Sequence, residues 1–510
     1  MRPWVPNTGR TRRALLKAGA VVAAAPALQL ASRAAGSGRP NILLLMTDQH
    51  RGDCLGSDGN SVLQTPNLDR LARGGVRFRC AYSSTPTCTP ARAALLTGMS
   101  PWSHGMLGYG AVAEHYPVEM PQLLRNGGYY TLGIGKMHWT PQRALHGFHR
   151  TILDESGREE SPGFRSDYRS WLFSEAPEAN PEPTGISWNG YAAKPFPLPE
   201  RLHPTAWVAE TAIHFLRGYG RPEPWFLKVS FERPHSPYDP PPRWMDRYAD
   251  APLPPARAGR WAEKNRPADR SIQDPWHGDF GAEAVRRARQ GYYGSISFID
   301  EQIGRILETL DGRGQLRDTL IFLLADHGDM LGDQYLWRKG YAYQPSARVP
   351  MLLHWPGGLD RAHAGRVIGQ PVEIRDVLPT LLDGAGVPVP PAVEGRSLLG
   401  LVRGDGRAWR EWIDLEHDVV YSPENHWNAL TDGVWKYIFH ADSGAEQLFH
   451  LAEDPYELVD LSGDAAYSAE RNQWRSRLIA HLAPRGEPWV VKGALGIRKA
   501  RQLYSPHYPG

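Results

Sequence analysis

The sequence predicts an α/β fold in which helices flank a central, mostly parallel β-sheet, with a smaller α+β domain at the C-terminal end. The first observation is a set of four continuous apolar runs of strand length, at 41–46, 130–134, 225–231 and 319–324. Apolar runs without alternation indicate strands that are buried on both faces of a parallel sheet. The second is a stretch of apolar residues spaced three and four apart between Ile296 and Leu310, which predicts a helix just before the last strand. Helix followed by strand is the order of a doubly wound domain.

The length of the chain and its pattern of apolar and polar residues predict three parts. These are an export signal over 1–36, a catalytic α/β domain over 37–400 and a C-terminal α+β subdomain over 401–510. A chain of 510 residues with 41% hydrophobic residues is long enough for several domains and too apolar to be disordered. Short alternating stretches at 435–439 and 447–451 indicate strands in the last part. Two long Pro-rich stretches, 154–204 and 237–279, are interpreted as insertions around the mouth of a site.

The first 36 residues resemble a twin-arginine export signal. Arg12 and Arg13 precede an uncharged, Ala-rich run over 18–32 that contains Pro26. This run is shorter than the roughly 20 residues that cross a bilayer, so we expect no stable membrane span. The twin-arginine machinery is therefore an expected partner, and the expected location is periplasmic or secreted.

Charge and cysteine content exclude two other classes of protein. The first 36 residues hold six of the 58 basic residues and no acidic one, so the rest of the chain is slightly acidic and is not expected to bind nucleic acid. Three cysteines cannot stabilise a chain of this length as a disulfide scaffold. Cys54 and Cys80 could pair after export, but two buried thiols are the favoured interpretation.

Polar residues suited to catalysis follow each of the four predicted strands. Ligands of an open parallel sheet bind beyond the carboxyl ends of its strands, so these residues are expected to meet at one site. In chain order they are Asp48 and Gln49, Lys136 and His138, His235, and Asp326 and His327.

A fifth cluster, Cys88-Thr89-Pro90-Ala91-Arg92, is the most specific motif of the chain. Good helix formers follow Pro90, and proline is favoured near the first position of a helix. Cys88 is therefore predicted at a helix N-terminus, where backbone N–H groups attract an anion.

This motif, with Leu95-Leu96-Thr97-Gly98 behind it, resembles the signature of the type I sulfatases, the formylglycine-dependent sulfatases of the alkaline phosphatase superfamily. Further blocks resemble the family in the expected order, so that the likeness covers nearly all of the chain after the export signal. It implies an alkaline-phosphatase-like core and hydrolysis of sulfate monoesters, either small aryl sulfates or glycan sulfates. The further blocks are 65–71, 135–138, 234–238, 326–329, 339–340 and 454–458.

The resemblance also implies a role for each site residue. Cys88 would be converted to formylglycine by a formylglycine-generating enzyme, a transient partner, and one hydroxyl of its hydrate would attack sulfur. Arg92 and Lys136 would fix the hydrate, and His138 would accept a proton in the elimination step. The implied sulfate-binding residues, which also protonate the leaving oxygen, are His235 and Lys339.

One divalent metal is implied as cofactor, and its expected ligands are Asp48, Gln49, Asp326, His327 and residue 88. Gln49 stands where many family members have an acidic residue, and His327 stands where they often have asparagine. The set is therefore two carboxylates, an amide and an imidazole. Oxygen ligands favour Ca²⁺, the expected ion, and the imidazole keeps Mn²⁺ open.

Three alternative functions compete with the sulfatase interpretation. Phosphonate monoester and phosphodiester hydrolases share the Asp-Gln and Asp-His pairs, but they tend to lack the pair formed here by Lys136 and His138. An exported, non-catalytic binder of sulfated glycans would keep Cys88 unmodified. A phosphatase with a Thr or Ser nucleophile is disfavoured because Cys88 occupies that position. The leaving group stays open between a phenol, a sugar hydroxyl and a small alkyl alcohol such as choline.

Overall fold

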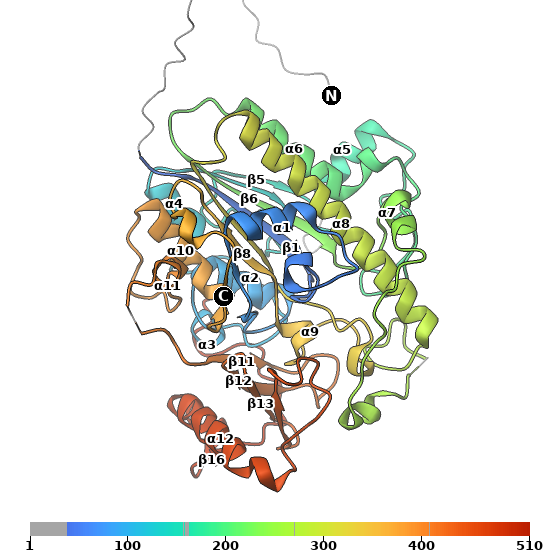
Figure 1. The fold of residues 1–510 in the computed structure, drawn as a ribbon, viewed down its shortest axis with the longest axis vertical. Helices are drawn as coiled ribbons and strands as arrows, with labels where there is room; N and C mark the ends of the chain where they lie inside the picture. Colours follow the sequence, from blue (N-terminus) through green and yellow to red (C-terminus); the bar gives the residue numbers. More distant parts are fainter. Residues whose placement is uncertain (1–37, 157, 159–162, 270, 407) are drawn as a thin grey trace, which may run out of the picture.

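The computed structural model describes residues 38–510, except 157, 159–162, 270 and 407. The predicted export signal, 1–36, lies outside the described residues. A large sheet with helices on both faces forms the body of the molecule, and a smaller sheet follows at the C-terminal end (Figure 1). The predicted α/β fold class is therefore confirmed.

The central sheet has eight strands in the order β5-β4-β6-β1-β7-β8-β2-β9. The four predicted strands are confirmed as β4 (Tyr130–Gly135), β6 (Trp225–Pro234), β1 (Asn41–Asp48) and β7 (Thr319–Ala325). They lie side by side and run parallel. The remaining strands are β5 (Arg150–Leu153), β8 (Met351–His354), β2 (Val76–Phe78) and β9 (Arg366–Ile368). Only β8 runs antiparallel to its neighbours β7 and β2, so the sheet is mostly parallel.

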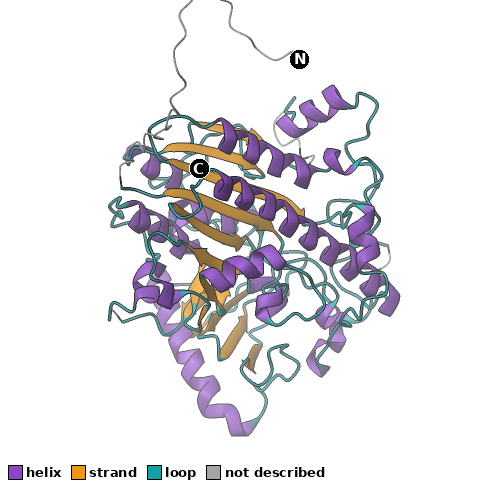
Figure 2. Ribbon diagram, turned by 45° about the horizontal axis from the view of Figure 1, so that its top comes forward, coloured by secondary structure: helices purple, strands orange, loops and turns teal. Residues whose placement is uncertain are grey.

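Alternate side chains of β1 enter two apolar cores, one on each face of the sheet, because successive residues of a strand point to opposite faces. Leu43 and Leu45 pack on one face, beneath helices α1 (Pro66–Gly74), α6 (Pro204–Gly218) and α8 (Ala282–Gly312). Ile42 and Leu44 pack on the other, beneath α2 (Cys88–Thr97), α4 (Met120–Asn126), α10 (Val377–Ala385) and α11 (Leu398–Arg403). Figure 2 shows this layered arrangement. The predicted helix at 296–310 is confirmed as part of α8.

Short elements occupy the connections around this sheet. The two Pro-rich stretches contain the helices α5 (Asp167–Glu175) and α7 (Pro242–Arg247) together with short 3₁₀ turns. β3 (Ala81–Tyr82) pairs with β10 (Val372–Glu373) away from the main sheet. The remaining short α-helices are α3 (Pro101–His104) and α9 (Gln344–Ala347).

The C-terminal part is an antiparallel sheet with one long helix, α12 (Ser468–Leu482). The strands predicted at 435–439 and 447–451 are confirmed as β13 (Trp435–His440) and β14 (Glu446–His450). Trp427 and Ile438 of this sheet pack against Tyr82 and Met330 of the main body, so the two parts share a core. The other two strands of this sheet are β11 (Ile413–His417) and β12 (Trp427–Thr431), while β15 (Val490–Val491) and β16 (Ala494–Leu495) form a separate two-stranded sheet.

The favoured interpretation of Cys54 and Cys80 is confirmed, whereas the uncharged run on which the membrane expectation depends, 18–32, lies outside the described residues. Cys54 and Cys80 are separate, buried thiols, as the favoured interpretation expected. Among residues 38–510, apart from the gaps named above, the structure contains no helix with the length and apolarity needed to cross a bilayer.

Candidate active site

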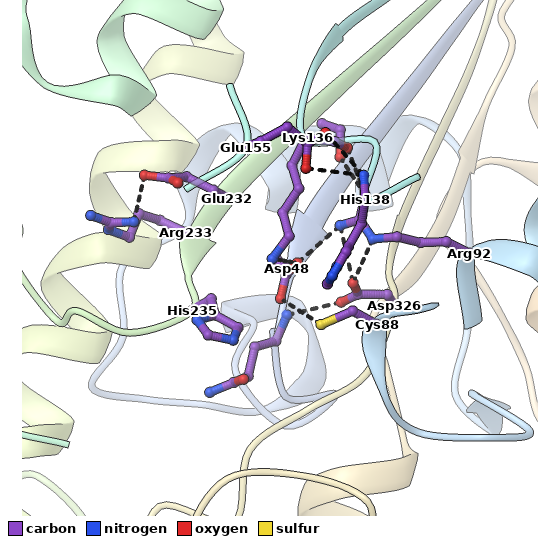
Figure 3. Close-up of polar contacts among 12 residues, drawn as sticks. Asp48, Cys88, Arg92, Lys136, His138, Glu155, Glu232, Arg233, His235 and Asp326 are labelled. Atoms are coloured by element: carbon purple, nitrogen blue, oxygen red, sulfur yellow. Dashed lines mark hydrogen bonds and ion pairs between the residues drawn. The ribbon is translucent and has the colours of Figure 1, made fainter. Parts of the chain in front are cut away.

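The polar residues predicted to converge do meet at the carboxyl ends of four adjacent strands (Figure 3). Asp48 is the last residue of β1, Lys136 follows β4, His235 follows β6, and Asp326 follows β7. The Lys136 ammonium is 2.6 Å from Asp48 Oδ2, although the two residues come from different strands. The strand order alone therefore assembles most of the site.

Cys88 lies at the first position of α2, with its Sγ pointing into this cluster. Pro90 lies in the first turn, and Gly98, with a φ of 68°, ends the helix in the left-handed conformation that glycine adopts most easily. Sγ is 3.1 Å from His327 Nε2 and 3.7 Å from Asp48 Oδ1. Because every residue of α2 is buried, the sulfur is held in one place.

The guanidinium of Arg92, one turn along α2, joins the two active-site carboxylates. Its Nε donates to Asp326 Oδ2 at 3.0 Å and its Nη2 donates to Asp48 Oδ2 at 3.0 Å. Its Nη1 donates to the Lys136 carbonyl at 2.6 Å. A planar group with donors in a fixed fork is suited to holding two carboxylates at once. Arg92 thereby engages Oδ2 of each carboxylate, while Oδ1 of Asp48 faces the cysteine and Oδ1 of Asp326 accepts from two backbone N–H groups.

Four of the five expected metal ligands form a compact group. Asp48, Cys88, Asp326 and His327 each offer a ligand atom, and all four atoms lie within 4.8 Å of one another. His327 Nδ1 donates to the Gly328 carbonyl at 2.9 Å, which leaves Nε2 with its lone pair toward the group. Carboxylate oxygens and a neutral imidazole nitrogen fit a divalent cation.

Gln49, the fifth expected ligand, lies beside this group with its backbone and its side chain both engaged. Its backbone N–H donates to Asp326 Oδ1 at 3.0 Å. Its side-chain Oε1 accepts from Lys339 Nζ at 2.6 Å, and its Nε2 donates to Asp329 Oδ2 at 2.5 Å. The amide oxygen therefore lies on the side of Lys339, and the amide NH₂ lies on the side of Asp329.

The positively charged side chains of the site stabilise the ionised forms of Asp48 and Cys88. Burial alone would raise the pKa of Asp48, but cationic neighbours, Lys136 foremost, hold that pKa well below its usual range. Burial and the charge of Asp48 both raise the pKa of Cys88, yet Lys339 and Lys136 outweigh them, so the thiol pKa is lowered. A pocket with this balance is suited to binding an anionic ester.

His235 and Lys339, the expected sulfate-binding pair, lie together on one side of the site. Lys339 Nζ lies 2.5 Å from His235 Nε2. His235 Nδ1 donates to the Ser236 carbonyl at 2.9 Å, so Nε2 is the ring atom that accepts from the lysine. Burial and the charge of Lys339 lower the pKa of His235 well below its ordinary value, so the ring is neutral.

His138 is held by residues of the first Pro-rich insertion. Its φ is 62°, and its backbone N–H donates to Glu155 Oε1 at 3.0 Å. Arg158 Nη1 lies 2.6 Å from the ring Nε2, and the Tyr109 hydroxyl lies 3.3 Å from the same atom. Burial and the charge of Arg158 lower the pKa of His138 well below its ordinary value. The interpretation of 154–204 as an insertion at the site is supported by these contacts.

Several residues around the site were missed by sequence reasoning. Glu155 and Arg158 lie in a stretch without periodicity, where nothing marks a single residue. Asp329 belongs to a recognised block but carried no expected role. His417 of β11, by contrast, is one of the residues that the sequence indicates as able to reach the site from the C-terminal part. It accepts a hydrogen bond from Thr87 Oγ1 at 2.9 Å, directly before Cys88.

Two protein-family models together match nearly the whole described length of the chain. The family model "Sulfatase" matches residues 40–387, and "N-sulphoglucosamine sulphohydrolase, C-terminal" matches residues 332–483. The first of these alone covers more than half of the chain.

Individual relatives agree with this match. An arylsulfatase of Clostridium perfringens is 40% identical over 466 residues, which is 89% of this chain and 96% of that protein. A choline-sulfatase of Rhizobium meliloti is 34% identical over 84% of this chain and 83% of that protein.

The fold of the chain is also similar to that of a solved structure. The phosphonate monoester hydrolase of Agrobacterium radiobacter superposes with a TM-score of 0.74 at 27% identity, covering 91% of this chain and all of that one. The chain therefore belongs to the sulfatase family of the alkaline phosphatase superfamily, and it is an enzyme that hydrolyses sulfate esters.

Proposed function

We propose that the chain hydrolyses sulfate monoesters outside the cytoplasm, with Cys88 converted to formylglycine and with one divalent metal. The observation that carries the proposal is the position of Cys88. Its Sγ lies at a helix N-terminus, 3.1 Å from His327 and 3.7 Å from Asp48, in a pocket that also holds the cations Arg92 and Lys136. A nucleophile in this place, surrounded by cations, is suited to attack on an anionic ester.

The metal would be held by residues whose donor atoms fit it. Asp48, Asp326 and His327 offer two carboxylates and an imidazole, with residue 88 beside them, and the Gln49 amide oxygen would complete the set. When bound, a divalent cation polarises an oxygen of the ester and stabilises negative charge. Four oxygen donors favour Ca²⁺ as the resident ion, and the single imidazole keeps Mn²⁺ as the second choice.

Converted residue 88 would supply two hydroxyls as an aldehyde hydrate, one for attack on sulfur and one for the later release of sulfate. Arg92 keeps Asp48 and Asp326 in place, so that a carboxylate oxygen faces the hydroxyl that must lose its proton. Lys136, paired with Asp48, adds a positive charge on the strand-β4 side of the anion.

The two histidines are suited to opposite proton transfers. Lys339 donates to His235, and this pair would bind the sulfate and supply a proton to the leaving oxygen. Burial and the charge of Arg158 lower the pKa of His138, so its imidazole is neutral and only weakly basic in the free protein. The negative charge of a bound ester would raise this pKa, and His138 would then accept the proton that is removed when residue 88 is regenerated.

The relatives suggest the substrate class to test first. An aryl sulfate follows from the 40% identical arylsulfatase, and a phosphonate ester is the competing choice from the similar solved structure. We expect a kcat/KM for 4-nitrophenyl sulfate at least about tenfold above that for bis(4-nitrophenyl) phosphate or 4-nitrophenyl phenylphosphonate, which share its leaving group.

One control variant and two contrary outcomes make this comparison decisive. Cys88→Ala should reduce turnover of all three esters to background, because residue 88 is the proposed nucleophile. A preference for the phosphonate or the phosphodiester would replace the proposal with the alternative hydrolase. Saturable binding of a sulfated glycan, with no turnover of any ester, would indicate a binder.

Export by the twin-arginine machinery, with a formylglycine-generating enzyme acting on Cys88 first, is the proposed route to this compartment. The support is the arginine pair at 12–13 before an uncharged run. Replacing both arginines with lysine should leave the protein in the cytoplasmic fraction with unchanged activity per molecule. Equal export of the variant would contradict this route.

A further inference from the structure

We propose that Asp329 is a positioning residue that fixes which end of the Gln49 side-chain amide faces the metal ligands. The inference rests on the proposed function, because it needs Gln49 to be a ligand of the cation. It assigns a role to a buried carboxylate that lies outside the group of metal-ligating residues.

A glutamine ligand is directional in a way that an acidic ligand is not. A carboxylate offers equivalent oxygens, but an amide has one oxygen that can bind a cation and one NH₂ group that cannot. Gln49 can therefore serve as a ligand only if something holds its NH₂ group on the side away from the cation. A site with an acidic residue at this position would need no such partner.

Asp329 has the contacts that this task requires. The residue is completely buried. Its Oδ2 accepts from Gln49 Nε2 at 2.5 Å and from the Tyr238 hydroxyl at 2.5 Å. Its Oδ1 accepts from the backbone N–H groups of Leu331 at 2.9 Å and Arg338 at 3.1 Å. An ionised carboxylate only accepts hydrogen bonds, so the group of Gln49 that faces it must be the NH₂.

The oxygen end of the Gln49 amide is held by a hydrogen-bond donor, the Lys339 ammonium. Gln49 Oε1 accepts from Lys339 Nζ at 2.6 Å, and an ammonium only donates. The backbone of Gln49 is also held, because its N–H donates to Asp326 and its carbonyl accepts from the Tyr292 hydroxyl at 2.5 Å. With both the backbone and the amide fixed, the side-chain oxygen has a single direction.

The segment after β7 supplies both groups that hold the two ends of the Gln49 amide. It carries the ligands Asp326 and His327, then Asp329, and finally Lys339. One connection therefore provides two ligands, the group that orients a third, and the cation beside that third ligand. Outer residues that orient metal ligands typically change metal affinity by about 10- to 100-fold when they are replaced.

The direct test is Asp329→Asn, which keeps the shape of the side chain but makes it asymmetric. The backbone N–H groups of Leu331 and Arg338 cannot turn, so they would take the asparagine oxygen. The asparagine NH₂ would then face Gln49, which must turn its own oxygen away from the ligand group. We expect the Kd for Ca²⁺ or Mn²⁺, measured by titration calorimetry, to rise about 10- to 100-fold.

Tyr238→Phe is the matched control. It removes a second donor from the same oxygen of Asp329, and the contact of that hydroxyl with the Gln49 amide, but it leaves in place the carboxylate that accepts from Gln49. Its Kd for the metal should stay within about threefold of the native value, because the orientation of Gln49 is unchanged.

A rescue experiment separates orientation from a general structural role. Gln49→Glu alone places two carboxylates against each other and should weaken metal binding. In Gln49→Glu with Asp329→Asn, the asparagine NH₂ can donate to the new glutamate, whose second oxygen then faces the cation. The double variant should bind the metal at least about tenfold more tightly than Gln49→Glu alone.

The outcomes distinguish this inference from the function on which it rests. Native affinity in Asp329→Asn, or a double variant that binds no better than Gln49→Glu, overturns the positioning role. The second comparison stays informative if Asp329→Asn alone does not fold. A native protein that binds no divalent metal at all would instead contradict the proposed function.

Discussion

Arg92 is the residue on which the geometry of both active-site carboxylates depends. Its three donor nitrogens reach Asp48, Asp326 and a backbone carbonyl, and its side chain is fully buried. Lysine has a compact ammonium on a flexible stem and cannot reproduce these directions. A change of Arg92 should therefore disturb both carboxylates at once.

Arg92→Lys is expected to lower kcat/KM for 4-nitrophenyl sulfate by roughly 100- to 1000-fold, because loss of one preorganised donor commonly has that effect. Arg143→Lys is the matched control, since Arg143 forms an exposed ion pair with Asp167. The control should keep native activity. If Arg92→Lys retains kcat/KM within threefold of the native protein, the role given to Arg92 is wrong.

Lys228 of β6 is buried, and its ammonium lies 5.7 Å from the centre of the Trp139 ring. Burial, and secondarily the charge of Arg92, lowers its pKa to about 7. An unfolded lysine has a pKa of about 10.4, so between pH 7 and 10 the unfolded chain binds more protons than the folded one. The contribution of Lys228 to stability is therefore present above that range and is lost as the pH falls through it.

Lys228→Met should raise the melting temperature at pH 7, because an apolar side chain of similar length removes the cost of burying the charge. The gain should shrink when the same pair of proteins is compared at pH 9. Calorimetric melting at the two pH values measures both effects. A lower melting temperature for the variant at pH 7 would show that the buried ammonium stabilises the protein.

Single-residue roles were predicted from the sequence where a strand end or a motif marked them. Asp48, Lys136, His235 and Asp326 each follow an apolar run, and Cys88 lies in a compact motif, so the structure brings together what the spacing indicated. Glu155 and Asp329 act through contacts with residues 18 and 280 positions away. Contacts of that kind depend on tertiary packing, which no local pattern records.

At the scale of secondary structure, the C-terminal sheet takes part in the site although its residues lie far along the chain. The carbonyl of Gly340, next to Lys339, accepts from Trp427 Nε1 at 3.0 Å and from Asn425 Nδ2 at 3.2 Å. Thr87, next to Cys88, donates to His417 of β11. The sheet therefore fixes the backbone beside both the cysteine and the lysine.

Trp427→Phe keeps an aromatic ring in the shared core but removes the indole N–H that holds Gly340. We expect kcat/KM for 4-nitrophenyl sulfate to fall about 3- to 10-fold, the change that corresponds to loss of one neutral hydrogen bond. Trp435→Phe, on the neighbouring strand β13, is the control and should leave kcat/KM unchanged. Equal effects of the two changes would mean that the sheet acts only through general stability.

Long buried strands were predicted from the sequence, whereas short strands near the sheet edges were not. The four central strands were predicted because they are buried on both faces and therefore read as continuous apolar runs. β2, β5 and β9 were missed because they have only three or four residues and lie at or next to the sheet edges, where polar side chains such as Arg77 and Arg150 are tolerated. Short edge strands owe their conformation to the neighbour with which they pair.

At the scale of the whole molecule, several buried histidines that are neutral in the folded protein predict that its stability falls in acid. Burial lowers the pKa of His104 to about 3 and the pKa values of His354, His417 and His426 to about 4. Unfolded histidine has a pKa of about 6.5, so between pH 6.5 and 4 the unfolded chain binds more protons. Stability is therefore full above pH 6.5 and falls as the pH drops through this window.

The melting temperature should accordingly fall steadily from pH 7 to pH 5. His104→Asn is expected to make this dependence shallower, because the asparagine oxygen can still accept from the Met106 N–H while one titrating group is removed. Thermal unfolding followed by circular dichroism at intervals of half a pH unit tests both statements. A melting temperature that does not change over this range would contradict them.

The central claim concerns the chemical state of residue 88, since the proposed chemistry depends on it. The most direct measurement is mass spectrometry of the peptide that contains Cys88, from protein produced together with a formylglycine-generating enzyme. A mass about 18 units below that of the cysteine peptide is predicted, the difference between a thiol and an aldehyde at this position. An unmodified cysteine in folded protein that still hydrolyses 4-nitrophenyl sulfate would contradict the account.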